Sequence, residues 1–381
     1  MKKIINGILI TPYRMLEGNE IAYEGNKIVE IGENIQGDFE EIIDAKGMYV
    51  TPGFVDLHVH GGVGYNFAST DKEAIKKAAL MHAQKGSTTI FPTISLHNPT
   101  ITDEDWSILG ALNESCKESD LNKTGPTIEG IHTEGPFIGR IFPDIPTCEC
   151  KKEIYEPLVE KTPYLKIVTV APETKGIKDA VRYFTDHNIY TSAGHCDNPN
   201  YDEFMELVEL GTNQVTHLYS STKGVYRVNG ARYPGLNESS LMCDDVYVEI
   251  IGDSIHLTPR MMEYVYRNKS ASKVCLATDC HPTDKTFAKG EKPLEIMEIA
   301  GNTAIITYAA MDFLVGYVAN DTNIPLIDAV KMATINPARA CGINNHKGTL
   351  AIGQDADILI FGDDVEMKYV VARGETILKN L

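Results

Sequence analysis

The sequence has few of the positive charges that a protein needs to bind a nucleic acid or an anionic membrane surface. Its 381 residues contain 35 Lys and Arg against 53 Asp and Glu, a formal net charge of −18. Such a chain cannot offer a broad cationic surface, so an anionic ligand must be met by a few local cations. We therefore expect neither a nucleic acid nor a membrane as partner.

Cysteine pairs and long apolar runs are also missing. The eight cysteines form no C-x-x-C pair, and the chain is too large to need a disulfide framework. No run approaches the roughly 18 apolar residues of a membrane span. The N-terminal MKKIINGILITP is interrupted by Asn6 and Gly7 and lacks a cleavage site, so it predicts a β-strand rather than a secretion signal. We expect a cytoplasmic protein with reduced thiols.

Both ends of the chain consist of short β-type runs that are separated by turns containing Gly, Asn and Asp. Neither end is long enough to bury a sheet face alone. We therefore predict that residues 1–51 and 345–381 pack together as a small β-sandwich.

Strands and helices alternate between these ends. Eight apolar strands are predicted at 54–59, 88–93, 127–131, 166–171, 189–193, 214–216, 246–250 and 274–277. Helices are predicted at 71–84, 103–119, 151–161, 176–187, 201–210, 259–268 and 325–334. Eight such units indicate an α/β fold with a (β/α)₈ TIM barrel over 52–344, and a doubly wound open sheet is the alternative.

Six polar side chains stand at the C-terminal ends of the predicted strands. They are His58 and His60 (strand one), Glu134 (three), His195 (five), His217 (six) and Asp279 (eight). A single residue of this kind is more often a hydrogen-bonded structural group than a ligand. In a TIM barrel, however, these strand ends form the face on which active sites are built, so the six should converge.

The residue types at these positions suit a divalent metal ion. Four imidazoles and two carboxylates favour zinc, with iron as the alternative, and are too rich in nitrogen for magnesium or calcium. One ion suffices, while Glu134 could bridge two. A metal-activated water needs a proton acceptor, and Asp279 fits as general base and then general acid. We expect the neighbouring Cys196 and Cys280 to be packing residues.

Cations near the same face could bind an anionic group such as a phosphate. His256 follows strand seven, and the segment after strand six contains Lys223, Arg227 and Arg232. The alternative is that these are solvated loop residues.

The motifs of the chain resemble those of the amidohydrolase superfamily and, within it, of the N-acetylglucosamine-6-phosphate deacetylase family. The similarity runs nearly end to end, through PGFVDLHVHGG (52–62), HTEGPF (132–137), SAGH (192–195), THLY (216–219), RYPGL (232–236), ATD (277–279) and KGTLAIGQDADILIF (347–361). It implies a metal-dependent barrel with a small β domain, usually a homodimer, that removes acetate from an amino-sugar 6-phosphate.

The resemblance also implies roles for individual residues. Glu134, His195 and His217 match the metal ligands of the family, and Asp279 matches its catalytic acid/base. His58 and His60 match the form that can hold a second metal ion. His256 and Arg232 match contacts to the phosphate of a sugar-phosphate substrate, with Arg232 acting in its own or the partner subunit. Ser220 and Ser221 stand where the family usually has Asn-Ala, and we expect them to contact substrate.

Two segments, 138–150 and 280–292, depart from the family pattern, and the first lacks a histidine that usually contacts the sugar. A related substrate, such as N-acetylgalactosamine 6-phosphate or another acylated amine or cyclic amide, therefore stays open. Cyclic amidases carry a metal-bridging lysine after strand four, which VTVAPE lacks. A non-catalytic relative would be expected to have lost ligands, whereas all six are present.

Overall fold

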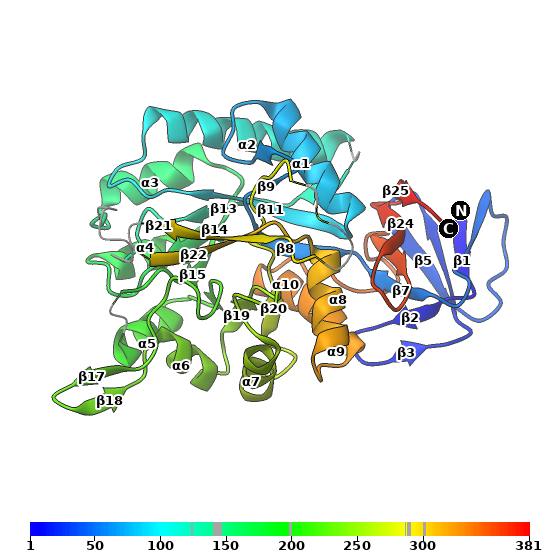
Figure 1. The fold of residues 1–381 in the computed structure, drawn as a ribbon. Helices are drawn as coiled ribbons and strands as arrows, with labels where there is room; N and C mark the ends of the chain where they lie inside the picture. The colour runs from blue at the N-terminus through cyan, green and yellow to red at the C-terminus, as the bar shows by residue number, and fades with distance from the viewer. Residues whose placement is uncertain (123–124, 140–146, 198–199, 286, 288–290, 300–301) are drawn as a thin grey trace.

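Eight parallel strands form the body of the protein in the computed structural model, which describes residues 1–122, 125–139, 147–197, 200–285, 287, 291–299 and 302–381 (Figure 1). The barrel strands, in order, are β8 (Phe54–Val59), β11 (Ser87–Ser95), β13 (Ile131–Glu134), β14 (Leu165–Val170), β15 (Tyr190–Ala193), β16 (Gln214–Val215), β19 (Tyr247–Ile250) and β20 (Val274–Leu276). A short β12 (Thr127–Ile128) also pairs with β11. The predicted TIM barrel is thus confirmed.

The barrel closes between its first and last strands just above β20. Val59 forms a parallel bridge with Cys280, and the backbone N–H of His60 donates to the Cys280 carbonyl at 2.9 Å. The backbone N–H of Asp279 donates to the carbonyl of His58, also at 2.9 Å. The closing seam therefore joins two segments that both carry predicted site residues.

Ten helices are described around and beside the barrel: α1 (Lys72–Gln84), α2 (Asp103–Asn122), α3 (Lys152–Lys161), α4 (Ile177–Asp186), α5 (Tyr201–Glu209), α6 (Leu236–Met242), α7 (Pro259–Lys269), α8 (Met311–Asp321), α9 (Leu326–Ala333) and α10 (Ile335–Ala340). Local capping explains two starts: Asp71 accepts from the Glu73 N–H before α1, and Asn200 accepts from the Glu203 N–H before α5. The predicted helices are present, whereas α6, α8 and α10 were not predicted.

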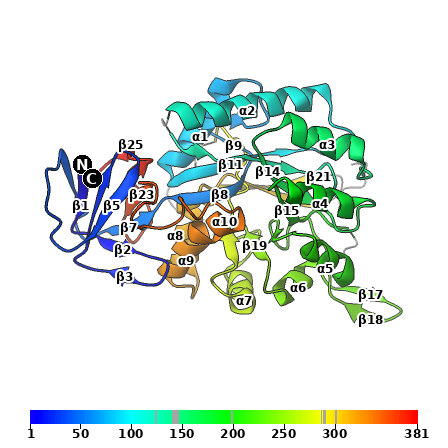
Figure 2. The same cartoon turned by 180° about the vertical axis from the view of Figure 1, so that it is seen from behind.

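Two sheets built from both chain ends form the small β domain, which lies beside the barrel with the termini close together (Figures 1 and 2). One sheet has the order β5-β4-β1-β6, and the other β25-β24-β23-β7-β2-β3. Their strands are β1 (Lys2–Ile5), β2 (Ile8–Ile10), β3 (Met15–Leu16), β4 (Glu20–Glu24), β5 (Lys27–Gly32), β6 (Glu41–Asp44), β7 (Tyr49–Pro52), β23 (Ile358–Phe361), β24 (Met367–Ala372) and β25 (Glu375–Lys379). The antiparallel β7–β23 pair joins the two ends, as expected of the sandwich. The predicted domain boundaries, 1–51 with 345–381 and 52–344, remain predictions.

The β-strand predicted in the N-terminal MKKIINGILITP is divided between these two sheets. Asn6 has φ 56°, which turns the chain, and a side chain at Gly7 would approach Val50 Cγ2 to 2.3 Å. Residues that look like one apolar run therefore form β1 in one sheet and β2 in the other.

Buried cations connect the small β domain to the barrel. The ammonium group of Lys347 lies 2.7 Å from Asp357 Oδ2, 2.9 Å from Asp355 Oδ2 and 2.9 Å from Thr127 Oγ1 beside the barrel. Arg373 donates to the carbonyl of Ser119 at the end of α2 at 2.7 Å. The two units are therefore joined by charged hydrogen bonds as well as by apolar packing.

Two hairpins extend the barrel and were not predicted. One pairs β17 (Tyr226–Val228) with β18 (Ala231–Tyr233), and the other pairs β21 (Leu294–Ile299) with β22 (Asn302–Thr307). A smaller pair, β9 (Gly61–Gly62) and β10 (Tyr65–Asn66), follows the first barrel strand. The β22 end contacts the segment after the eighth strand, since the His281 N–H donates to the Thr307 carbonyl at 2.9 Å. Of the divergent segments, residues 140–146, 286 and 288–290 lie outside the described part.

None of the helices in the described part of the chain is both long and apolar enough to cross a membrane. All eight cysteines are free and buried, including Cys196 and Cys280. Their expected packing role is consistent with this burial.

Candidate metal centre

The first barrel strand directs two imidazoles to one place. All six residues of β8 are buried, and His58 and His60 are two positions apart, so their side chains project to the same side. Their Nε2 atoms lie 3.1 Å apart. The pair therefore forms one wall of a shared site.

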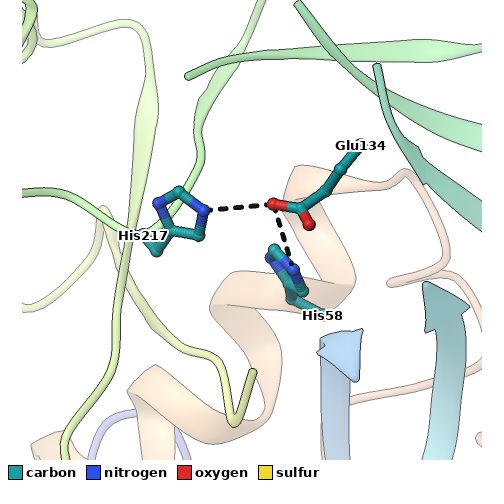
Figure 3. A group of neighbouring side chains, drawn as sticks. All are labelled: His58, Glu134 and His217. Carbon is teal, nitrogen blue, oxygen red and sulfur yellow. Dashed lines mark hydrogen bonds and ion pairs between the residues drawn. The ribbon is translucent and has the colours of Figure 1, made fainter. Parts of the chain in front are cut away.

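Glu134, the last residue of β13, lies at the centre of the site. Its Oε1 is 2.7 Å from His195 Nε2, 3.1 Å from His217 Nε2 and 3.4 Å from His58 Nε2. Its Oε2 is 3.3 Å from His60 Nε2. Figure 3 shows His58 and His217 pointing at the same carboxylate from different sides. One carboxylate thus contacts four imidazoles that come from three different strand ends.

Asp279, in the segment that follows β20, completes the cluster. Its Oδ1 lies 3.1 Å from His60 Nε2 and 3.4 Å from His58 Nε2. Two overlapping triplets, His58–Glu134–His217 and His58–His60–Asp279, have ligand atoms within 4.8 Å of one another. The structure therefore brings all six predicted residues together, although their roles as ligands remain predictions.

The backbone at three of these residues is in the left-handed region. His195 has φ 52°, His217 φ 26° and Asp279 φ 47°. Residues with a side chain rarely adopt this conformation, which costs of order 1 kcal/mol or more. The backbone is therefore strained at the strand ends from which these side chains enter the site.

Burial and the neighbouring charges oppose each other in setting the pKa values of the cluster. Burial lowers the pKa of His58 and His60, but the carboxylates of Glu134 and Asp279 outweigh it, so the pKa of His58 lies well above normal and that of His60 at about 9. Burial raises the pKa of Glu134 and Asp279, yet the imidazoles hold both pKa values below the ordinary range. For His195 burial dominates and lowers the pKa. Without a metal ion, the cluster is a set of buried ion pairs.

The arrangement of nitrogen atoms fits a metal ion better than it fits protons alone. Two pairs of ring nitrogens face each other, His58–His60 at 3.1 Å and His195–His217 at 3.0 Å between their Nε2 atoms. Only one proton fits between two such nitrogens, whereas a cation can accept both lone pairs. The Nδ1 atoms of His195 and His217 are also buried without a hydrogen-bond partner in the described residues. The donor set suits a nitrogen-accepting divalent ion such as zinc or iron.

The four predicted substrate-binding residues occupy different environments. Ser220 and Ser221 are half-buried three and four positions after His217, and the Ser220 N–H donates to the His217 carbonyl at 2.8 Å. His256 Nδ1 lies 2.7 Å from Asp253 Oδ2. Burial lowers the pKa of His256, but the Asp253 carboxylate raises it by more, so the pKa is above its ordinary value. Arg232 is exposed on the β17–β18 hairpin, which projects from the barrel (Figure 1), so it is not part of the cluster within this chain.

Several residues around the cluster were missed from the sequence. His97 follows the second strand, and its ring centroid lies 6.2 Å from that of His195. His281 stacks on His60 with ring centroids 4.5 Å apart, and burial lowers its pKa to about 4. Their positions after strands two and eight were a usable signal, because the other site residues follow the same rule. Glu249 lies inside β19, where only its charge within an apolar strand marked it.

The protein is a TIM barrel with a cluster of histidines and carboxylates at the C-terminal ends of its strands, the face on which enzymes of this fold carry their active sites. The Amidohydrolase family profile matches residues 49–377, and the chain belongs to this family. The family relationship predicted from the motifs is thereby confirmed.

Within this family, the chain is similar to several N-acetylglucosamine-6-phosphate deacetylases. An N-acetylglucosamine-6-phosphate deacetylase from Caenorhabditis elegans is 28% identical over 362 residues, which cover 88% of this chain and 84% of that protein. One from Bacillus subtilis (strain 168) is 26% identical, with 96% and 94% covered. The predicted resemblance to this group is thus supported along almost the whole chain.

A solved structure shares the complete fold. The N-acetylglucosamine-6-phosphate deacetylase from Pasteurella multocida matches with a TM-score of 0.84 at 21% identity, over 98% of this chain and 99% of that one. The enzyme from Mycobacterium smegmatis in complex with N-acetyl-D-glucosamine-6-phosphate matches with a TM-score of 0.83 at 23% identity, over 99% of both chains. At these identities the similarity establishes the arrangement of barrel and β domain.

Proposed function

We propose that this amidohydrolase removes the acetyl group of N-acetylglucosamine 6-phosphate by metal-dependent hydrolysis, giving glucosamine 6-phosphate and acetate. The observation that carries the proposal is Glu134, whose Oε1 lies within 3.4 Å of three imidazole nitrogens from three different barrel segments. The names of its relatives supply the substrate.

The proposed metal ligands are Glu134, His195 and His217, with His58, His60 and Asp279 available to a second ion. The second group is one of the two triplets with ligand atoms within 4.8 Å of one another. The first group is the one that the family resemblance implies, and its histidines lie 2.7 and 3.1 Å from Glu134 Oε1. Zinc is the preferred ion and iron the alternative. A divalent ion bound there would polarise the acetyl carbonyl and lower the pKa of a water molecule.

Asp279 is the proposed proton shuttle. Its carboxylate lies at the open side of the cluster, half-buried where Glu134 is buried. The neighbouring imidazoles lower its pKa and keep it ionised, the form in which a general base begins. It would take a proton from the attacking water and then give it to the departing amine nitrogen, which must be protonated to leave. His60, 3.1 Å away, holds the carboxylate in place.

The proposed substrate contacts lie on the rim. His256, whose pKa the Asp253 carboxylate raises, would face the phosphate, and Ser220 and Ser221 would contact the sugar. We propose that, in a homodimer, Arg232 reaches the phosphate of the substrate that is bound to the partner subunit. The exposed apolar side chains beside it, Val228 at 46% and Tyr233 at 46% exposure, support a covered hairpin. A cytoplasmic location agrees with eight free cysteines.

The test combines elemental analysis of the purified protein with acetate release from N-acetylglucosamine and N-acetylgalactosamine, each with and without 6-phosphate. We expect one or two divalent ions per chain and fastest acetate release from N-acetylglucosamine 6-phosphate. If the enzyme releases acetate fastest from N-acetylgalactosamine 6-phosphate, the proposed reaction stands and the proposed sugar is wrong. Absence of bound metal together with absence of acetate release would refute the proposal.

A further inference from the structure

A buried glutamate beneath the cluster has no role in the proposed mechanism. Glu249 lies in β19, the seventh barrel strand, and is only 1% exposed. Its Oε2 lies 3.4 Å from Nδ1 of His58 and 3.3 Å from the backbone nitrogen of His217. Its Oε1 is buried with no hydrogen-bond partner in the described part of the chain.

This placement is costly for stability alone. Removing a carboxylate from water is unfavourable unless a cation or several donors replace the lost hydration. Among the described residues the only ion-pair partner of Glu249 is His58, and a histidine is charged only when protonated. A neutral side chain of the same size would pack in the barrel at a lower cost, so the carboxylate points to a role in the site.

The two contacts reach proposed ligands at the ends of two different barrel strands, the first and the sixth. A proton on Nδ1 of His58 that is donated to Glu249 leaves the lone pair of a neutral ring on Nε2, the atom that faces Glu134 and His60. The same oxygen accepts from the N–H of His217, whose φ of 26° is strained. One carboxylate oxygen can thus select the tautomer of one ligand and hold the backbone of another.

We propose that Glu249 is a positioning residue that presents the Nε2 atoms of His58 and His217 to the metal ion. This inference rests on the proposed metal site and adds to it a group that touches neither the ion nor the substrate. The contact of 3.4 Å between Glu249 and His58 is long for a hydrogen bond, so the restraint comes from both contacts together.

The variants Glu249→Gln and Glu249→Ala test the role, with Glu263→Gln as the matched control. Glu263 is also buried and accepts from the Asn323 N–H at 3.2 Å, but it lies on α7 away from the cluster. Zinc affinity is measured by competition with a chromophoric chelator, and stability of the metal-free proteins by urea unfolding. The ring nitrogens of His58 are followed by ¹⁵N NMR.

We expect zinc affinity to fall about 10- to 100-fold in Glu249→Ala, as is usual when a group behind a metal ligand is lost. A smaller fall is expected in Glu249→Gln, which keeps one oxygen acceptor. The metal-free Glu249→Gln protein should stay folded, and the Nδ1–H signal of His58 should shift. Glu263→Gln should bind zinc within about twofold of the parent.

Unchanged zinc affinity in both Glu249 variants would overturn the inference, as would a loss that Glu263→Gln shares. If Glu249→Ala does not fold, the near-isosteric Gln variant decides. A parent protein that binds no zinc, iron or other divalent ion refutes the proposed function itself. A parent that binds metal but releases no acetate refutes only the proposed substrate, and the comparison of affinities still stands.

Discussion

Replacement of Lys347 by methionine should destabilise the protein far more than loss of an ordinary surface lysine. The ammonium group is almost fully buried, with 1% of the side chain exposed, and lies within 2.9 Å of Asp355, Asp357 and Thr127. Methionine keeps the apolar stem and removes only the charge and its hydrogen bonds. The two carboxylates then stay in the junction without this cation.

The expected cost follows from the burial of these partners. Removing one member of a buried ion pair leaves an uncompensated charge and costs about 3–5 kcal/mol. Lys27 supplies the control, because it also contacts Asp355, at 2.7 Å, but its side chain is 42% exposed. Its replacement by methionine should cost at most about 1 kcal/mol, as for other exposed pairs.

The effect should also depend on pH in a defined direction. Burial raises the pKa of Asp355, but Lys347 and Lys27 lower it more, to below its ordinary value of 3.8. Burial lowers the pKa of Lys347, but Asp357 and Asp355 raise it above 10.5. The stabilisation that Asp355 contributes to the folded state is therefore present above pH 3.8 and is lost as the pH falls through its folded-state pKa. The stabilisation that Lys347 contributes is present below pH 10.5 and is lost as the pH rises through its folded-state pKa. In Lys347→Met the destabilisation should shrink towards about pH 4, because Asp355 has lost one of its two cations and takes up a proton more readily.

Urea unfolding provides the measurement. Circular dichroism follows both units, while the fluorescence of Trp106, the single tryptophan, follows α2 of the barrel. A Lys347→Met variant that loses no more free energy of unfolding than Lys27→Met would refute the assignment of the junction as a buried ion-pair network. Equal losses at about pH 4 and about pH 7 would refute its electrostatic origin.

Three further outcomes are expected. Asp279→Asn should lower kcat by about 10²- to 10⁴-fold because the proton shuttle is lost, with metal content retained by elemental analysis; Asp321→Asn on the surface is the control. Zinc affinity, measured by chelator competition, should fall as the pH is lowered below 9, by about tenfold per pH unit for each proton that the metal ion displaces. The reason is that the folded-state pKa of His60 is about 9 and that of His58 is also raised. In the metal-free protein, the stabilising ion pairs of the site are fully present below pH 6.5 and are lost as the pH rises through 9. Arg232→Ala should raise KM for the phosphorylated substrate roughly 10- to 100-fold and leave that of the unphosphorylated sugar unchanged; equal effects on both would place the anion site elsewhere.

Most of the barrel could be predicted from the sequence because its signals are local. Apolar runs of about four to six residues between amphipathic helices mark parallel strands, and β8 agrees with its predicted bounds, 54–59. The rule that functional residues lie at the C-terminal ends of strands then grouped six residues that are distant in the sequence. That inference depended on strand position alone and required no side-chain geometry.

What could not be predicted from the sequence depends on packing. Helix α8, MDFLVGYVAND, is apolar on nearly all sides, so it shows no contrast between a buried and an exposed face. Helix α6 has seven residues, including two serines and one asparagine, which are weak helix formers. The contact of Glu249 with His58 joins residues 191 positions apart, and no spacing rule predicts it.

The seam that closes the barrel has a consequence for synthesis of the protein. His58 leaves the ribosome early, but its carbonyl pairs with the Asp279 N–H, and the two positions are separated by most of the barrel. A nascent chain that ends before residue 279 lacks the last carboxylate and the strand partner that holds the first two histidines. The complete set of proposed metal ligands therefore forms only after residue 279 has been synthesised, which would delay capture of an ion until all eight barrel strands exist.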